Sequence, residues 1–314
     1  MTSRGTTSTS STGGSGGPWR VLRWLTGRQP ASAATERAVL AVAALLFVAA
    51  FVFGLRAVPE DLQLTVWPLV GLALVAVPLA NVANGLEYAT AARIGGHAVP
   101  VGEALEVSVL SSAANLLPLP GAALVRVRAM RRRGSSYRQA LAVTALVGGA
   151  WLATSLVLAG GLLAARRPGE VDDAAALAVL GCGVTGVALA GVAVRRLAPA
   201  GQATVLAAGL LAVEVLAVAV AALRYLLVLG ALGLDVTLEQ AVALSVASVL
   251  ASALGFVPGG LGLREALAGV IAGLVGLPVA TGVLAAAVDR LVGLPVLAAL
   301  SAGIVARGGA DRRR

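Results

Sequence analysis

Long apolar stretches separated by short polar segments dominate the sequence. Several of these stretches approach the roughly 20 apolar residues that an α-helix needs to cross about 30 Å of hydrocarbon. They predict full membrane crossings at residues 38–57, 65–86, 139–164, 174–194, 204–230 and 281–306. The pattern therefore predicts an all-α fold, a polytopic bundle of about six transmembrane helices.

Two further apolar segments, about 103–134 and 239–276, are interrupted near their middle by proline and glycine. The first contains Pro118-Leu-Pro-Gly121 and the second contains Pro258-Gly-Gly260. Proline removes a backbone donor and its ring clashes with the preceding turn, so a helix ends there. Each segment is expected to form two half-helices that meet at a turn, as a re-entrant hairpin. An ordinary kinked helix that crosses fully is the alternative.

The two broken segments resemble each other. Ser108-Val-Leu-Ser-Ser-Ala-Ala-Asn-Leu-Leu-Pro118 aligns without gaps on Ser248-Val-Leu-Ala-Ser-Ala-Leu-Gly-Phe-Val-Pro258. Because three predicted crossings separate them, two hairpins would enter from opposite faces of the membrane. This predicts an inverted repeat, with one copy over about 37–165 and the other over about 173–307. Transporters of this build place broken helices near the bilayer midplane, so the two proline turns are expected to lie close together there.

Composition and charge narrow the class further. Of the 314 residues, 58% are hydrophobic and 12% are charged, and the mean hydropathy is +0.91. A soluble domain would be about a quarter charged, so that class is excluded. The formal net charge of +9 comes from arginine alone, because the sequence contains no lysine. Arginines between membrane crossings favour membrane lipids as partners, anionic phospholipids above all, rather than nucleic acid.

The positions of the arginines predict the orientation. Basic residues precede the first crossing, which places the N-terminus in the cytoplasm. The later basic clusters then fall on the same side, and both termini are expected in the cytoplasm of a plasma-membrane protein. Residues 1–36 are too polar to fold and predict a disordered tail, followed by a membrane domain over 37–307 and a basic tail over 308–314. The arginines that carry this assignment are Arg4, Arg20, Arg23, Arg28, Arg37, those of 126–138, Arg195, Arg196 and those of 307–314.

The second broken segment also resembles a known family. Phe256-Val-Pro-Gly-Gly-Leu-Gly-Leu-Arg-Glu-Ala266, followed by Val288-Asp-Arg-Leu291, is similar to the flippase-like membrane family. That family includes the transmembrane region of lysylphosphatidylglycerol synthases. Weaker similarity is found at Asn115-Leu-Leu-Pro118 and Leu124-Val-Arg126, and the resemblance spans roughly residues 81–306. It implies that the chain moves a lipid or lipid-linked substrate across the bilayer.

The candidate substrate path follows from the charges at membrane depth. An anionic head group needs donors there, because a bare charge in hydrocarbon costs several kcal/mol. The backbone amides that follow Gly259 and Gly260 are such donors, and Arg264 can bind a phosphate with two hydrogen bonds. The path candidates are Arg264, Glu265, Asp289, Arg290, Glu214, Arg126, Ser112, Asn115, Ser252, Pro258, Gly259 and Gly260.

A purely structural role is the alternative for these charges, in which Arg264 and Glu265 neutralise partners such as Asp289 and Arg290. The two roles are compatible if the network also lines a cavity. Arg264 is expected to contact Asp289 or Glu214, and its removal is expected to leave that acid unpaired. Arg224 is expected to reach the outer membrane interface instead.

Three classes of function compete. A translocator of lipid or lipid-linked substrates fits the inverted repeat and the charges best, and a small-solute secondary transporter would share these features. A membrane enzyme or a non-transporting membrane scaffold fits less well. No enzyme activity, cofactor or metal is expected, because the sequence contains no paired-His or Asp-rich metal motif. The seven residues after Arg307 leave no room for a soluble aminoacyl-transfer domain. Without an ATP-binding P-loop, transport is expected to be passive or gradient-driven.

Overall fold

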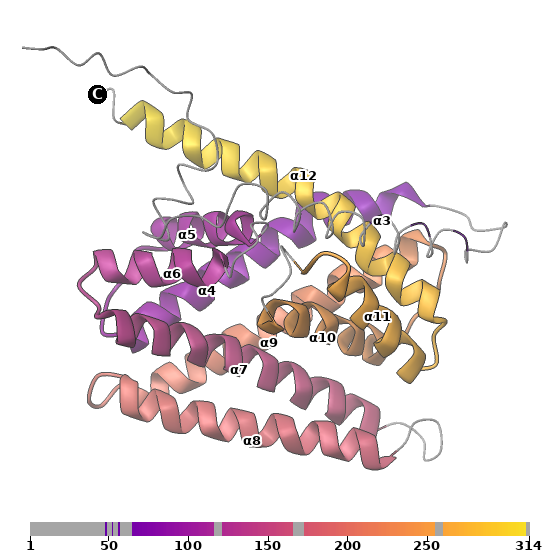
Figure 1. The fold of residues 1–314 in the computed structure, drawn as a ribbon, viewed down its shortest axis with the longest axis horizontal. Coiled ribbons are helices and arrows are strands. Elements are labelled where there is room, and N and C mark those ends of the chain that lie inside the picture. Colours follow the sequence, from indigo (N-terminus) through magenta and orange to yellow (C-terminus); the bar gives the residue numbers. More distant parts are fainter. Residues whose placement is uncertain are drawn as a thin grey trace, which may run out of the picture.

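The computed structural model describes residues 65–115, 121–165, 173–254 and 260–311, together with the single positions 48, 52 and 56. Every regular element in that part of the chain is a helix (Figure 1). The predicted crossing at 38–57 and the predicted N-terminal tail lie outside the described residues. Pro118 and the pair Pro258 and Gly259 also lie outside them, so the predicted approach of the two proline turns stays a prediction.

Five of the predicted crossings are confirmed. The described residues contain five helices that are long and apolar enough to span a membrane. The first of them, Val66–Ile94, extends beyond the predicted end at residue 86 and stops at Gly95, which caps it. The five helices are α3–η1–α4 (Val66–Gly71, Leu72–Ala76 and Val77–Ile94), α7 (Tyr137–Ala164), α8 (Asp173–Leu197), α9 (Ala203–Ala231) and α12 (Val279–Asp311).

Each broken segment forms two short helices, as the proline and glycine positions predict. The first comprises α5 (Val101–Ala114) and α6 (Gly121–Arg132), and the second α10 (Leu238–Leu254) and α11 (Leu263–Leu274). The longest of the four has 17 residues, about 25 Å at 1.5 Å per residue, which is less than the hydrocarbon thickness. In each pair the two helices pack against one another (Figure 1). Side-by-side packing is the geometry of a hairpin rather than of one kinked crossing.

The order of elements repeats along the chain. In the first half α4 packs on α5, α5 on α6 and α6 on α7. In the second half α9 packs on α10, α10 on α11 and α11 on α12. The crossings α7, α8 and α9 separate the two hairpins, and α7 and α8 run side by side along one face of the bundle (Figure 1). An odd number of crossings places the two hairpins on opposite membrane faces, as in an inverted repeat.

The first described crossing contains a π-helical segment that the apolar pattern does not reveal. This segment, η1, spans Leu72–Ala76 and is followed at once by Pro78 in the first turn of α4. The ring of a proline inside a helix clashes with the carbonyl four residues earlier, and a wider turn relieves that clash. Such segments recur at functional sites. Here it sets the position of Val77, which borders the central cavity described below.

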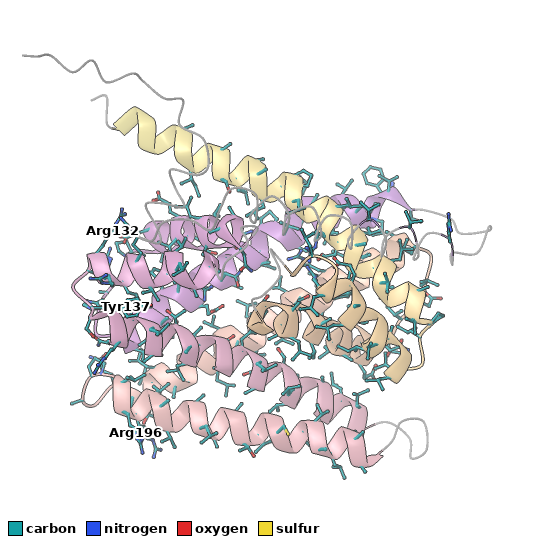
Figure 2. The ribbon with its side chains drawn as sticks, in the orientation of Figure 1. Arg132, Tyr137 and Arg196 are labelled. Carbon is teal, nitrogen blue, oxygen red and sulfur yellow. The ribbon has the colours of Figure 1, made fainter. Side chains whose placement is uncertain are left out.

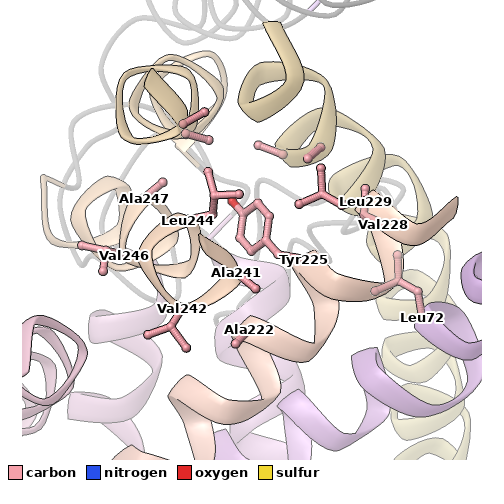
Figure 3. Close-up of a cluster of buried hydrophobic side chains, with 14 of the residues drawn as sticks. Leu72, Ala222, Tyr225, Val228, Leu229, Ala241, Val242, Leu244, Val246 and Ala247 are labelled. Carbon is pink, nitrogen blue, oxygen red and sulfur yellow. The ribbon is translucent and has the colours of Figure 1, made fainter. Parts of the chain in front are cut away.

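The apolar core falls into two clusters that meet on α9. One cluster surrounds the fully buried Tyr225 and includes Leu72 of η1 and Leu244 of α10. Figure 3 shows Tyr225 in the middle of this cluster, between Leu244 and Leu229. The other cluster packs α4, α5, α6 and α7 against the first half of α9 through Leu206 and Leu210. Helix α9 therefore joins the two halves of the bundle.

Basic side chains gather at one end of the bundle. Figure 2 shows Arg132, Tyr137 and Arg196 together at that end, where α6 and α8 finish and α7 begins. Beside them, Arg133 donates a hydrogen bond to Glu103 at the start of α5, which closes the base of the first hairpin. That hydrogen bond raises the pKa of the Arg133 guanidinium. A single basic end is the feature from which the sequence predicts a cytoplasmic face.

Glycines allow several helices to pack closely. A Cβ atom at Gly282 of α12 would lie 2.2 Å from the backbone oxygen of Ala268 in α11. A Cβ atom at Gly160 of α7 would lie 2.5 Å from the backbone nitrogen of Leu180 in α8. Close packing through small residues is a main source of helix association in membranes. These two contacts hold the second hairpin to α12 and α7 to α8.

Replacing Gly282 by leucine is expected to lower the free energy of unfolding, because the new side chain forces α11 away from α12. The expected loss is about 1–3 kcal/mol, the usual size of an overpacking effect. Thermal unfolding in a mild detergent measures it. Gly303→Leu on the same helix is the control, since a Cβ atom there meets nothing within 4 Å. Equal melting temperatures for the two variants would contradict the packing described here.

Candidate functional site

A polar cavity lies between α4, α5, α9, α11 and α12, so both broken segments contribute to its lining. Its volume is about 160 Å³. Ser112 and Asn115 reach it from the end of α5, and Arg264 reaches it from the start of α11. The structure thus brings elements of both sequence repeats to one place. The remaining lining residues are Val77, Ala80, Asn81, Asn84, Arg224, Arg290, Gly293, Leu294 and Leu297.

A buried carboxylate, Asp289 of α12, organises the charges beside this cavity. Arg224 of α9 donates two hydrogen bonds to it, from Nε to Oδ1 at 2.8 Å and from Nη2 to Oδ2 at 2.9 Å. Arg264 of α11 donates a third from Nη2 to Oδ2 at 2.6 Å. Asp289 is fully buried, out of reach of water. Removal of its carboxylate would leave Arg224 and Arg264 without their shared partner, and water could not replace it. Three helices are tied together through one side chain.

These contacts confirm one prediction and correct two. Arg264 contacts Asp289, one of the two acids expected for it. The prediction that Arg224 reaches the outer interface is wrong, because the buried Asp289 holds it inside the bundle. The expectation that removal of Arg264 leaves the acid unpaired is also wrong, since Arg224 still donates two hydrogen bonds to Asp289.

A second ion pair fixes the turn before α11. Arg290 lies 3.1 Å from Glu265, between Nε and Oε1, and Glu265 is fully buried. Arg290 also donates from Nη2 to the backbone oxygen of Gly260 at 3.3 Å. Gly260 and Gly262 have φ angles of 65° and 77°, a region that favours glycine. The glycines shape the turn, and Arg290 holds it against α12.

The network carries an excess of positive charge. Arg224, Arg264 and Arg290 stand against the two carboxylates of Asp289 and Glu265, a formal balance of +1. Asp289 lies ten residues after the start of α12 at Val279, about 15 Å into the helix at 1.5 Å per residue. Asp289 is therefore about midway along Val279–Ile304, the part of α12 that is long and apolar enough to span a membrane. An uncompensated positive charge there can attract an anion.

Arg264 borders the cavity together with Arg224 and Arg290, and two contacts hold its guanidinium. Its guanidinium lies 5.9 Å from the centre of the Tyr225 ring, within the range of a cation–π contact. Its side chain is 16% exposed and borders the cavity, whereas Asp289 behind it has no exposed surface. The ion pair with Asp289 and the contact with the Tyr225 ring together hold the Arg264 guanidinium in a fixed orientation.

Two asparagines of α4, Asn81 and Asn84, also line the cavity. Asn81 donates from its amide to the backbone oxygen of Val77 at 3.0 Å, and its Oδ1 atom has no hydrogen-bond partner among the described residues. Ser108 of α5 donates to the backbone oxygen of Asn81 at 2.9 Å. Asn81 and Asn84 are three residues apart and so share one face of the helix.

Other predicted path residues lie elsewhere. Arg126 of α6 forms an ion pair of 2.5 Å with Glu87 of α4, away from the lining of the central cavity. Glu214 of α9 lies near that pair and does not contact Arg264, so its predicted alternative role as the partner of Arg264 is wrong. Ser252 donates to the backbone oxygen of Ser248 at 2.7 Å and is exposed, outside the cavity lining.

The side chains around the cavity are mostly hydrogen-bond donors. Among the described residues, no three His, Cys, Asp or Glu side chains gather closely enough to hold a metal ion. The lining combines guanidinium, amide and hydroxyl groups, which donate hydrogen bonds to an anion. Together with the helices that carry it, this cavity defines a polytopic membrane protein with two half-helix pairs around a cationic centre.

The comparisons with known proteins agree with that class. A family model described as the lysylphosphatidylglycerol synthase TM region matches residues 38–301. The match covers most of the chain, and the chain therefore belongs to this family, as the motif around Arg264 predicts. No curated protein matches the chain.

Replacing Asp289 by asparagine is expected to lower the free energy of unfolding by about 3–5 kcal/mol, because it leaves two buried guanidinium groups without their counter-charge. Asparagine has nearly the same size as aspartate, so the loss of unfolding free energy measures the effect of the charge rather than of the side-chain volume. Thermal unfolding in detergent measures the effect. Asp235→Asn is the matched control, since Asp235 is exposed. A melting temperature for Asp289→Asn equal to that of the control would show that Asp289 does not hold the helices together.

Proposed function

We propose that this membrane protein moves an anionic lipid, or the head group of a lipid-linked substrate, across the bilayer through the central cavity. The observation that carries the proposal is the excess of one positive charge beside a polar cavity that both half-helix pairs border. Transporters with inverted repeats place their substrate sites at such broken helices near the bilayer midplane.

The charges of the cavity match a phosphate. An isolated anion in hydrocarbon costs several kcal/mol, and a fixed guanidinium lowers that cost through charge-assisted hydrogen bonds. Arg264 presents such a group, and Asp289 keeps it in place without fully neutralising the network. The unpartnered Oδ1 atom of Asn81 in the cavity lining can accept a hydrogen bond from a hydroxyl. The substrate that fits best is therefore a phosphate-bearing head group that also carries hydroxyls.

The lining also changes character along α12. Arg290 lies at the charged end, Gly293 follows one turn later, and Leu294 and Leu297 continue the wall with apolar surface. A Cβ atom at Gly293 would lie 3.3 Å from Nη2 of Arg224. The absence of a side chain at Gly293 therefore makes space for the guanidinium of Arg224. An amphiphile can place its head group at Arg264 and its hydrocarbon along the two leucines. This gradient favours a lipid substrate over a purely polar one.

A small-solute secondary transporter is the second candidate. The cavity volume of about 160 Å³ favours this candidate, because that volume suits a small organic anion better than a whole phospholipid head group. The role proposed in either case is transport rather than catalysis, since the cavity lining offers arginines, amides and a hydroxyl and neither histidine nor cysteine. Movement of a labelled lipid distinguishes the two candidates.

Arg264→Ala and Arg264→Lys are expected to slow lipid movement by about tenfold or more, since a hydrogen bond to a charged group is worth about 1.5–3 kcal/mol. Lysine keeps the charge but loses the planar fork. The assay uses the protein reconstituted into liposomes that contain acyl-labelled fluorescent phosphatidylglycerol. Dithionite bleaches the outer-leaflet probe, and further bleaching reports lipid that has crossed.

Both variants are expected to melt close to the wild type, because Arg224 keeps Asp289 paired. Arg93→Ala on α4 is the control, since Arg93 is exposed and outside the cavity lining. Wild-type rates in Arg264→Ala would remove Arg264 from the path. A wild-type protein that leaves the labelled lipid in place but takes up a small organic phosphate would favour the solute transporter.

The basic end of the bundle is proposed to face the cytoplasm, with both termini on that side of the plasma membrane. Cysteines introduced at Ser11 and Asp311 in a Cys182→Ser background are expected to react with an impermeant maleimide only after permeabilisation. Ala165→Cys at the opposite end of α7 is the control and should react in intact cells. Reaction of either terminal cysteine in intact cells would reverse the orientation.

A further inference from the structure

A second cavity lies between α7, α8 and α9, away from the central one. Its volume is about 300 Å³, and its lining is apolar except for Thr154, Thr204 and Glu214. Among the described residues, none lines both cavities. Helix α9 borders both, with Glu214 at the second cavity and Arg224 at the central one.

The carboxyl group of Glu214 is the unusual feature of this cavity. Glu214 is fully buried, and neither of its oxygens has a hydrogen-bond partner among the described residues. The charged groups that face it are Glu87 on α4 and Arg126 on α6, with Tyr88 beside Arg126. Arg126 is already paired with Glu87 at 2.5 Å. Helices α7 and α8 contribute no ionisable residue to the cavity lining.

The cavity is open along one side of α9. Thr204, Ala208 and Leu211 are exposed lining residues, and Leu211 is 44% exposed. Glu214 lies on the same face of α9, at the end of the cavity that is buried. Thr204 and Glu214 are ten residues apart, about 15 Å along the helix. The cavity is therefore a groove that starts near the beginning of α9 and ends at a carboxyl group.

The chemistry of this groove selects a particular ligand. A buried carboxyl without a partner is costly in its ionised form, and a proton or a cation removes that cost. A hard divalent cation needs about six oxygen ligands, and the groove supplies one carboxylate and two hydroxyls. An organic cation needs one counter-charge and apolar walls for its hydrocarbon. An organic anion finds no counter-charge in the groove, because the protonated carboxyl of Glu214 is neutral and the carboxylate repels it.

We propose that this groove binds a lipophilic ammonium ion, whose charge pairs with Glu214 in place of a proton. On binding, the proton leaves the Glu214 oxygen for water, and the carboxylate that remains pairs with the ammonium group. The hydrocarbon part of the ligand lies against Ala150, Val187 and Leu210. This site has the opposite charge preference to the central cavity and does not depend on the function proposed for it.

The test uses the purified chain in a non-ionic detergent and a matched pair of probes. Benzyltrimethylammonium carries the cation and phenylmethanesulfonate carries an anion on the same aromatic group. Isothermal titration calorimetry is expected to show one site for the cation and none for the anion. Binding is expected to release a proton, so the affinity rises by about tenfold per pH unit while the empty carboxyl is protonated. Cation binding without proton release, or equal binding of the anion, would overturn the proposal.

Two variants locate the site. Glu214→Gln removes the charge and is expected to weaken cation binding by at least about tenfold, as expected for loss of a charged partner. Gly191→Leu fills the groove from α8 without touching Glu214, and a Cβ atom there meets nothing within 4 Å, so the variant is expected to fold and to block binding.

Two controls complete the test. Glu106→Gln, at an exposed position of α5, and Arg264→Ala, at the central cavity, are both expected to bind the cation as the wild type does. Unchanged binding in Glu214→Gln or in Gly191→Leu would overturn the proposal. If Glu214→Gln does not fold, Gly191→Leu alone decides.

Discussion

The structure depends on one buried carboxylate. Asp289 receives three hydrogen bonds from Arg224 and Arg264 at a depth where a lone guanidinium would be very costly. Removing one member of a buried ion pair destabilises a protein strongly. The pairing therefore lets the chain keep arginines near the bilayer midplane. It also ties α9, α11 and α12 together beside the central cavity.

The apolar pattern predicts the helices well and their partners poorly. Long apolar runs and the breaks near Pro118 and Pro258 predict five described crossings and two pairs of half-helices. The cost of an unpaired Arg264 correctly predicts its contact with Asp289. Arg224 and Glu87 were not predicted to form ion pairs. Helix α9 is apolar on nearly every side, so the sequence does not show which of its faces turns inward. The asparagines of α4 mark one face of that helix but do not show which arginine Glu87 meets. The π-helical segment before Pro78 shifts that face further.

The two cavities on α9 have opposite charge preferences. Arg224 belongs to a network with a formal balance of +1, and Glu214 presents an unpartnered carboxyl. The two residues are ten positions apart, about 15 Å along the helix. The first hairpin is part of the same arrangement, because Arg126 and Glu87 lie beside Glu214 while Ser112 and Asn115 reach the central cavity.

We propose that the cationic cavity receives an anionic lipid head group. A cryo-electron microscopy map of the protein in nanodiscs rich in phosphatidylglycerol would reveal such a lipid. We expect density for a phosphate within hydrogen-bond distance of Arg264, with hydrocarbon density running along Leu294 and Leu297. A map that shows a well-defined Arg264–Asp289 pair and an empty cavity, with ordered lipid only on the outer surface, would contradict it.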